Sequence, residues 1–327
     1  MANRSASLLT ALILATSACA AKDDEKGAGK GADTAKTATA KLEASKSAPA
    51  FDSLRAYRYL KEQCDFGPRN PGSEGHKRAL AYFEKHFRGL GLAVTMQPFV
   101  HSDVTDGHKV ELTNVIVTAK GKDAKRPAIV LCAHWDTRPR ADQETSPMLM
   151  DRPIIGANDG ASGAAILMEL AHAFKILPPA RTVHLVLFDG EDYGKSGSLD
   201  EYFLGARHYA EHLPTPRPEY AVLLDMVGDR DLALPMERNS MGRNPELVRK
   251  IWERAQSLNL SEFRMEPGPV VWDDHMPLLA KGLPAVDIID FEYPAWHTTG
   301  DTPDKCSAHS LGVVGRLVAS LAFKPLP

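Results

Sequence analysis

The sequence predicts an α/β fold, a single domain in which a twisted, mostly parallel or mixed central sheet is covered by helices on both faces. Short apolar segments rich in β-branched residues alternate along the chain with longer segments of amphipathic helical spacing. Three of the short segments, residues 128–133, 183–188 and 221–226, are apolar at nearly every position, as in strands buried on both faces. At 327 residues the chain is long enough for one large α/β domain or two ordinary ones. No internal repeat divides it, and we expect one domain.

The first 50 residues are expected to lie outside this domain. Residues 1–20 resemble an export signal, in which a basic residue precedes a short apolar run and then small residues. The end of this segment fits either a bacterial lipoprotein signal, with Cys19 as the lipidated residue, or an ordinary secretion site at residues 18–20; we favour the lipoprotein. Residues 21–50 are almost all small or charged and are expected to form a disordered linker. We therefore expect an exported bacterial protein, periplasmic or anchored to a membrane, whose folded part spans residues 51–327.

Within the folded part, each helix is predicted from apolar residues three or four positions apart and from the residues at its ends. Ser73 can cap the second helix and Gly91 ends it, while Pro245 opens a later one. The predicted helices are residues 51–63, 74–90, 160–176, 201–212, 245–258, 273–282 and 307–323. The predicted strands are residues 92–100, 112–118, 128–133, 183–188, 221–226 and 284–289. A long loop with several prolines, residues 137–155, separates the third strand from the third helix.

The composition argues against several classes of function. A formal net charge of -3 without a basic stripe gives no reason to expect a nucleic-acid partner. The 4 cysteines are too few and too scattered for a disulfide framework or a zinc site built from thiolates. The chain also lacks a phosphate-binding loop, a dinucleotide-binding fingerprint and the G-x-S-x-G motif of serine hydrolases. After the export signal, no apolar run is long enough to span a membrane.

Acidic and histidine side chains gather at one predicted edge of the sheet. They lie at or just past the ends of buried strands, at the start of a helix, or in the loop after the last strand; these residues are His134, Asp159, Glu191, Asp192, Asp225 and His297. The carboxyl ends of parallel strands meet at one edge, where open α/β sheets bind their ligands. Carboxylate and imidazole groups without a thiolate are typical of a catalytic zinc site, which leaves one position open for substrate.

Each of these residues also has a purely structural interpretation. Asp159 can serve only as a helix cap, His134 as a hydrogen-bonded histidine of the core, and Asp225 as an acid bonded to backbone groups. The adjacent acids Glu191 and Asp192 can form a solvated turn. The coincidence of so many such residues at one edge favours a catalytic site, in which one acid of this pair binds a metal and the other transfers a proton.

Six longer segments carry a resemblance to a known family. They are HWDTRP at residues 134–139, PIIGANDGASG at 153–163, FDGEDYG at 188–194, LLDMVG at 223–228, DDHMP at 273–277 and WHT at 296–298. In order and spacing this set resembles the glutaminyl-peptide cyclotransferases, the glutaminyl cyclases of the zinc aminopeptidase superfamily, in their bacterial and animal secreted type. The resemblance covers nearly all of the chain from residue 51 to residue 323.

The resemblance implies a reaction in which the N-terminal Gln of a peptide or protein is cyclised to pyroglutamate with release of ammonia. It implies one zinc ion per chain, and the implied ligands are Asp159, Asp192 and His297. Glu191 is implied to be the general acid and base, with Asp225 and Asp273 as a hydrogen-bonded pair of acids beside it. The implied walls of the substrate pocket are Met226, Val271, Tyr293 and Trp296. Peptide and protein N-termini are the expected partners, and we expect a monomer.

A two-zinc aminopeptidase is the main alternative, because the same residues, with His134 as a ligand of the second ion, can hold two zinc ions and a bridging hydroxide. The DDH and WH motifs favour the cyclase. A third interpretation is a non-catalytic lipoprotein that uses a decayed hydrolase fold for binding, and the intact Glu191 argues against it. The family commonly has a Trp after the acid pair that walls the pocket. Residues 194–204 contain none, so either Tyr202 or Phe203 fills that place, or no residue does.

Overall fold

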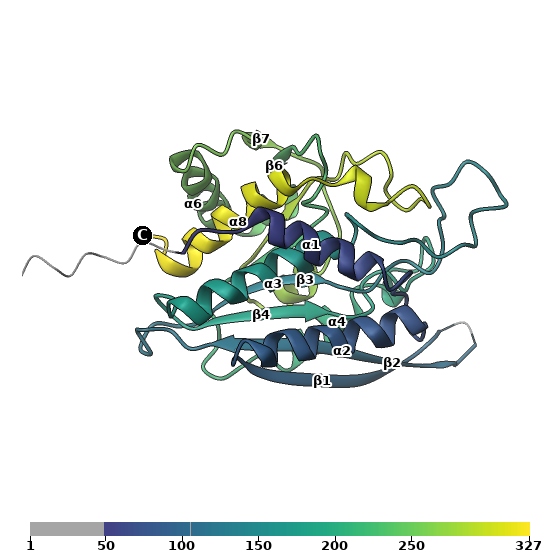
Figure 1. Ribbon diagram of the computed structural model, residues 1–327, viewed down its shortest axis with the longest axis horizontal. Helices are drawn as coiled ribbons and strands as arrows, with labels where there is room; N and C mark the ends of the chain where they lie inside the picture. Colours follow the sequence, from purple (N-terminus) through teal and green to yellow (C-terminus); the bar gives the residue numbers. More distant parts are fainter. Residues whose placement is uncertain (1–48, 105) are drawn as a thin grey trace, which may run out of the picture. The chain divides into compact units, whose positions relative to one another are not determined.

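The computed structural model describes residues 49–104 and 106–327. The expected export signal, with Cys19, and the expected linker up to residue 48 lie outside the described residues. The described chain folds as the α/β domain that was predicted (Figure 1). Among the residues that the structure describes, no helix is both long and apolar enough to cross a bilayer.

A six-stranded mixed sheet forms the centre of the domain, in the order β1–β2–β4–β3–β5–β8. Its strands are β1 (Ala93–Ser102), β2 (Lys109–Ala119), β3 (Ile129–His134), β4 (Val183–Phe188), β5 (Ala221–Asp225) and β8 (Ala285–Ile289). The β1–β2 and β2–β4 pairs are antiparallel, whereas β4, β3, β5 and β8 run parallel to one another. Because β3, β5 and β8 are buried at every position, their sequences are apolar throughout most of their length rather than alternating. The prediction of a mixed sheet is confirmed.

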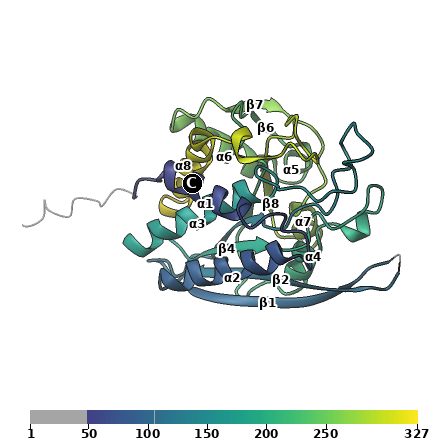
Figure 2. The same cartoon turned by 45° about the vertical axis from the view of Figure 1, so that its right-hand side comes forward.

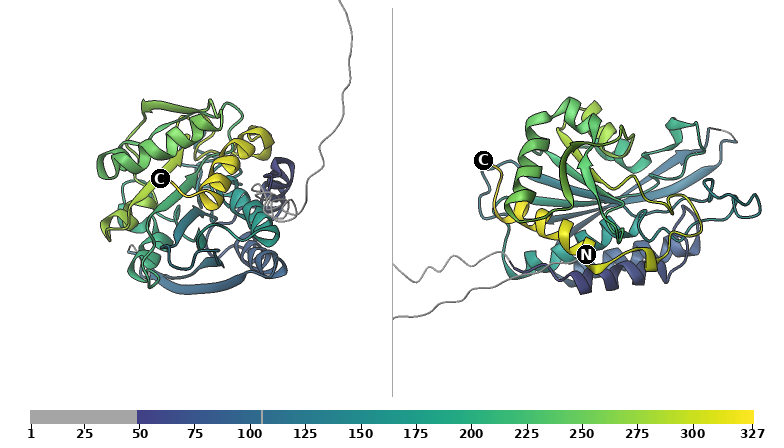
Figure 3. Two further views of the ribbon diagram at one scale, coloured as in Figure 1. Left: turned by 90° about the vertical axis from the view of Figure 1, so that its left-hand side faces the viewer. Right: turned by 90° about the horizontal axis from the view of Figure 1, so that it is seen from above.

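Helices cover both faces of this sheet, as Figure 2 and Figure 3 show. The apolar core of one face includes residues of α1 (Ser53–Cys64), α2 (Glu74–Gly89), α3 (Ala161–Ile176), α6 (Pro245–Ser257) and α8 (Ala308–Phe323). The core of the other face includes α4 (Leu204–Glu211) and α7 (His275–Ala280). The remaining elements are short: α5 (Arg238–Arg243), the 3₁₀ turns Leu199–Glu201 and Pro303–Lys305, and a small parallel sheet of β6 (Leu234–Met236) and β7 (Phe263–Pro267).

Most helix boundaries follow the capping residues in the sequence. Ser73 caps α2, since its hydroxyl accepts a hydrogen bond from the backbone N–H of His76 at 3.1 Å. α4 begins three residues later than predicted, because Phe203 has a left-handed backbone with φ of 60° and the helix starts only after it. Asp273 was predicted to start a helix, but it lies in the segment before α7, which begins two residues later. The sequence showed no sign of α5, β6 or β7, which are too short to display a period.

α3 approaches the sheet closely at Gly163. A Cβ atom at this position would lie 2.2 Å from the carbonyl oxygen of Leu224 in β5 and 2.8 Å from the Cβ of Ala133 in β3. Replacing Gly163 with Ala is expected to lower the free energy of unfolding by about 1–3 kcal/mol, because the helix and the strands would have to move apart. Urea unfolding measures this change. Gly242 in α5 is the control, since an added Cβ there meets no atom within 4 Å and Ala favours the helix. Equal destabilisation of both variants would contradict the prediction.

Candidate active site

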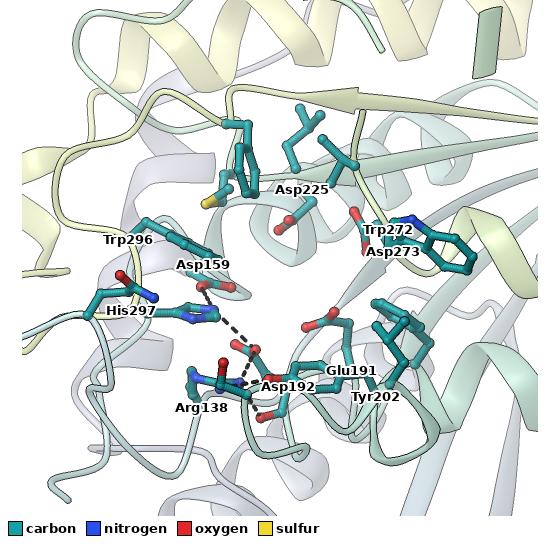
Figure 4. A pocket seen from close by; sticks show the side chains of 18 of the residues that line it. Arg138, Asp159, Glu191, Asp192, Tyr202, Asp225, Trp272, Asp273, Trp296 and His297 are labelled. Atoms are coloured by element: carbon teal, nitrogen blue, oxygen red, sulfur yellow. Dashed lines mark hydrogen bonds and ion pairs between the residues drawn. The ribbon is translucent and has the colours of Figure 1, made fainter. Parts of the chain in front are cut away.

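The side chains singled out in the sequence converge at the carboxyl ends of the parallel strands (Figure 4). His134 is the last residue of β3, and Asp225 is the last residue of β5. Glu191 and Asp192 follow β4 after a turn at Gly190, whose φ of 74° is left-handed. Three further residues reach the same place from loops: Asp159, Asp273 and His297. All of them except the buried His134 line one cavity of about 290 Å³.

Asp159, Asp192 and His297 have the arrangement of three metal ligands. Nε2 of His297 lies 3.5 Å from Oδ2 of Asp159 and 3.3 Å from Oδ1 of Asp192. These distances exceed those of good hydrogen bonds, but ligand atoms that each lie about 2.0–2.2 Å from one zinc ion are separated by similar distances. Oδ2 of Asp159 and Oδ2 of Asp192 are buried and have no hydrogen-bond partner among the described residues. The donor set, its spacing and its two unpaired oxygens therefore fit zinc.

The pKa values of Asp159 and His297 are also consistent with a site that binds a cation. Burial, together with the neighbouring carboxylate of Asp192, raises the pKa of Asp159 to about 6. Burial by itself would lower the pKa of His297, but the carboxylates of Asp192, Asp142 and Asp159 together outweigh it and raise the pKa to about 9. Without a metal, His297 is therefore protonated at neutral pH, and Asp159 becomes protonated below about pH 6. A divalent cation would replace the protons, so zinc binding is expected to release them.

Asp142 and Arg138 support the ligands from behind, a role that was not predicted from the sequence. Nε of Arg138 donates to Oδ1 of Asp142 at 2.8 Å, and Nη1 donates to Oδ1 of Asp192 at 3.1 Å. The same Oδ1 of Asp142 lies 3.5 Å from Nδ1 of His297. A carboxylate behind a metal-bound imidazole fixes the ring orientation and makes the ring a stronger ligand. The buried guanidinium holds this carboxylate in place.

Replacing Asp142 with Asn is expected to weaken zinc binding about 10–100-fold, because His297 loses both its orientation and a nearby negative charge. Competition with a zinc chelator measures the affinity. Asp151 is the matched control, since it lies exposed in the same loop, residues 137–155, and does not line the cavity. If the Asp142 variant bound zinc as tightly as the Asp151→Asn variant, Asp142 would have no part in orienting the ligand.

Two other buried carboxylates, Asp136 and Asp301, hold the backbone on which the ligands lie. Asp136 accepts hydrogen bonds from the N–H groups of Glu191 at 3.0 Å and Asp192 at 3.2 Å. Asp301 accepts the N–H of Asp159 at 3.1 Å. Each carboxylate thus fixes a turn that carries a ligand, and neither was assigned a role from the sequence. The occurrence of Asp136 directly after His134-Trp135 is the signal that could have indicated it.

Glu191 has the position and the proton affinity of a general acid and base. Its carboxylate lines the cavity but belongs to none of the groups that could hold a metal ion. Burial raises the pKa of Glu191 well above its ordinary value, and the adjacent carboxylate of Asp192 raises it further. A carboxylate with a raised pKa is a stronger base, and its acid form returns the proton later in a reaction.

His134 and Asp225 are hydrogen-bonded to each other, with 3.0 Å between Nε2 and Oδ1. Nε2 of His134 also lies 3.2 Å from Oδ1 of Asp159, and these three residues are close enough to hold a metal ion. Oδ1 of Asp273 accepts the backbone N–H of Asp274 at 2.5 Å. The implied hydrogen bond between Asp225 and Asp273 would require a proton on one of the two carboxyl groups, and it stays a prediction.

Behind Asp273 lies a cluster of buried ionisable groups, which no pattern in the sequence predicts. The side-chain polar atoms of Asp274, His275 and Asp287 have no hydrogen-bond partner among the described residues. Nε2 of His275 lies 3.4 Å from Oε2 of Glu237, which caps α5. Burial raises the pKa of Asp273, Asp274 and Asp287 well above the ordinary value, and the charges of neighbouring carboxylates add to the effect. These acids therefore keep protons to higher pH than exposed ones.

Apolar side chains line the rest of the cavity. Met226, Val271 and Trp296 are among them. Tyr293 is not, because its ring packs behind Met226 and Val271 and its hydroxyl donates to Asp301 at 2.8 Å. The other apolar or aromatic side chains of the wall are Leu199, Tyr202, Phe203, Val270, Trp272, Ile289 and Phe291.

Comparison with known proteins adds the following findings. Residues 114–322 match the model of peptidase family M28. The structure is similar to a glutaminyl cyclase from Fimbriiglobus ruber, with a TM-score of 0.77 and 38% identity over 84% of this chain and 95% of the other. It is also similar to a leucine aminopeptidase precursor from Bacteroides thetaiotaomicron, with a TM-score of 0.80 and 31% identity over 85% and 98% of the two chains. The glutaminyl-peptide cyclotransferase-like protein of Mus musculus is 29% identical over 281 residues, which are 77% of this chain and 70% of that protein.

Proposed function

The chain belongs to peptidase family M28, and we propose that it is a glutaminyl-peptide cyclotransferase, which converts the N-terminal Gln of a peptide or protein into pyroglutamate and ammonia. One observation carries this proposal. The group of Asp159, Asp192 and His297 lines the cavity and has two unpaired buried oxygens that fit a cation, whereas His134 and Asp225 already bond to each other. A site built for one zinc ion fits a cyclase. The chain is also similar to a glutaminyl cyclase over 95% of the length of that protein, and this similarity supports the same activity.

The proposed reaction needs one proton carrier and no water. Asp159, Asp192 and His297 would hold the zinc ion, which would act there as a Lewis acid toward the side-chain amide of the substrate Gln. Glu191 accepts a proton from the α-amine, whose nitrogen then forms a bond to the amide carbon of the same residue. Glu191 returns the proton to the departing nitrogen as the amide C–N bond breaks, which leaves pyroglutamate and ammonia. The carboxylates of Asp225 and Asp273 line the cavity where they can hold the amine.

Because the attack occurs within one residue of the substrate, the task of the protein is mainly to position that residue. Met226, Val271 and Trp296 form an apolar wall that confines the Gln side chain between the ligands and Glu191. Holding reacting groups in line can remove roughly 7–11 kcal/mol of a barrier. The wall also limits the access of water, which would otherwise compete with the amine.

A two-zinc aminopeptidase is the second candidate, since His134, Asp159 and Asp225 could hold a second ion. Such an enzyme would break the His134–Asp225 hydrogen bond on loading and would hydrolyse the first peptide bond. The number of zinc ions per chain separates the two functions: one is expected for the cyclase and two for the peptidase.

The activity test uses the purified protein with a Gln-initiated peptide and a Leu-initiated peptide, and it follows product mass. We expect the Gln peptide to lose ammonia and the Leu peptide to stay intact. Release of free N-terminal amino acids would identify an aminopeptidase and give His134 the role of a ligand. If zinc were bound and neither reaction occurred, the proposed function would be wrong.

We also propose that the protein is exported and anchored by a lipid on Cys19. The support is the sequence pattern of residues 1–20 and the polar linker that follows it. Replacing Cys19 with Ala should move the protein from the membrane fraction to the soluble periplasmic fraction. An unchanged distribution would exclude the lipid anchor.

A further inference from the structure

We propose that Trp272 binds the side chain of the second residue of the peptide, so that the enzyme favours substrates with a large apolar residue after Gln. This inference rests on the proposed function and deepens it. Trp272 is 58% exposed, although it is the immediate neighbour of Asp273 at the cavity. A large aromatic ring exposed at the mouth of a cavity is typical of a binding surface.

The segment that carries Trp272 alternates between buried and exposed side chains, as a strand does. Val271 and Asp273 are 5% and 3% exposed and belong to the buried side, whereas Val270 and Trp272 are 56% and 58% exposed. The inward residues therefore contact the substrate Gln, and the outward residues form the edge of the opening. Only one residue separates the buried positions from the exposed ones, so a peptide that fills the cavity meets Trp272 at its opening.

The position of Trp272 is fixed by the backbone of its neighbour. The N–H of Val271 donates to Oε1 of Glu237 at 3.0 Å, and its carbonyl accepts from Nδ2 of Asn239 at 2.7 Å. Neither the N–H nor the carbonyl of Trp272 bonds to another described residue, so both are available to the main chain of a bound peptide. An exposed ring on an anchored segment, beside backbone groups without an internal partner, suits a peptide better than a free amino acid.

The opening of the cavity is lined by three exposed apolar side chains, Leu199, Val270 and Trp272, which we call the apolar rim. They are 47%, 56% and 58% exposed, and all three line the same cavity. Figure 4 shows Trp272 across the cavity from Trp296 and His297. None of the three carries a charge, while carboxylates crowd the interior, so the rim is suited to an uncharged, apolar side chain.

The geometry of the reaction assigns the second residue to this rim. The α-amine and the side-chain amide of Gln must both face Glu191 and the zinc ligands, so the rest of the peptide has to leave through the opening. Consecutive Cα atoms lie about 3.8 Å apart, which brings the second side chain to the edge of the cavity. An aromatic second residue can stack on the indole of Trp272.

The test compares kcat/KM for two otherwise identical peptides, one beginning Gln-Phe and one beginning Gln-Gly. We expect the wild-type protein to prefer Gln-Phe, and Trp272→Ala to reduce the ratio of the two values about tenfold. Trp272→Phe keeps an aromatic ring and should retain most of the preference. Met265→Ala is the matched control, because Met265 is also exposed and apolar but does not line the cavity.

Four outcomes are decisive. A wild-type protein that cyclises both peptides equally well, or a Trp272→Ala variant with an unchanged ratio, would overturn this inference and leave the proposed function intact. A wild-type protein that cyclises neither peptide would overturn both. If Trp272→Ala lowers the ratio mainly by raising KM for the Gln-Phe peptide, a binding role is supported. An apolar contact that is equally strong in the bound substrate and in the transition state leaves kcat unchanged.

Discussion

Replacing Glu191 with Gln is expected to lower kcat by about 10²–10⁴-fold while the protein keeps its zinc and its fold. Gln fills the same space but cannot accept a proton from the substrate amine. Glu191 belongs to no group of potential metal ligands, so the zinc content should not change. Burial raises the pKa of Glu191, which means that its ionised form is disfavoured in the folded protein. A neutral Gln should therefore not lower the stability.

The measurements for this variant are turnover of a Gln-initiated peptide, zinc content by mass spectrometry and thermal unfolding. Glu292→Gln is the control, since Glu292 is exposed and does not line the active-site cavity. Retained turnover in Glu191→Gln would remove Glu191 from its catalytic role. Loss of zinc together with turnover would instead show that Glu191 is a ligand, and the assignment of the adjacent acids would have to be exchanged.

Several residues around the site have a left-handed backbone conformation that non-glycine residues rarely adopt. Among the described residues, the four non-glycine residues with positive φ include Phe203, Met226 and His297, all of which line the cavity. A left-handed backbone at such residues costs about 1–3 kcal/mol each and persists where the surrounding structure fixes it. At His297, the contacts from Asp142 and the two facing acids supply that restraint. The strain is therefore concentrated where the side chains must point into the cavity.

Local patterns in the sequence were sufficient to predict the fold class and the edge of the sheet that carries the site. The strands that end at His134 and Asp225 are continuous apolar runs followed by a polar residue, and this pattern depends only on neighbours in the chain. The same is true of the turn that presents Glu191 and Asp192 after β4. Burial on both faces produces this pattern, so the position of each residue could be inferred without knowing its contacts.

The supporting residues could not be predicted in this way, because their partners are remote in the sequence. Asp301 bonds to the backbone of Asp159 across 142 positions, and Arg138 bonds to Asp192 across 54. A buried carboxylate and an exposed one look the same in a sequence. The same limit applies to the pocket wall. The sequence does not show that Tyr293 packs behind the wall, whereas Trp272 lines the cavity.

Replacing Asp159 with Asn is expected to abolish zinc binding at the site and to reduce turnover at least about a hundredfold, because Lewis-acid catalysis is worth several kcal/mol. The variant should nevertheless fold. Burial and the carboxylate of Asp192 raise the pKa of Asp159 to about 6, above its ordinary value, so the ionised form destabilises the metal-free protein as the pH rises through 6. At neutral pH, Asn removes this cost. The metal-free variant should thus be at least as stable as the metal-free wild type.

Zinc titration followed by thermal unfolding measures both parts of this prediction. Zinc should raise the melting temperature of the wild type, since it binds the folded state, and should not raise that of Asp159→Asn.

His134→Gln is the informative comparison. In a one-zinc cyclase this variant keeps a full equivalent of zinc, because Asp159, Asp192 and His297 are intact. In a two-zinc peptidase it falls from two equivalents to one, while Asp159→Asn, which removes a residue common to both ligand groups, disturbs both ions. The two variants together therefore identify the metal centre independently of any substrate.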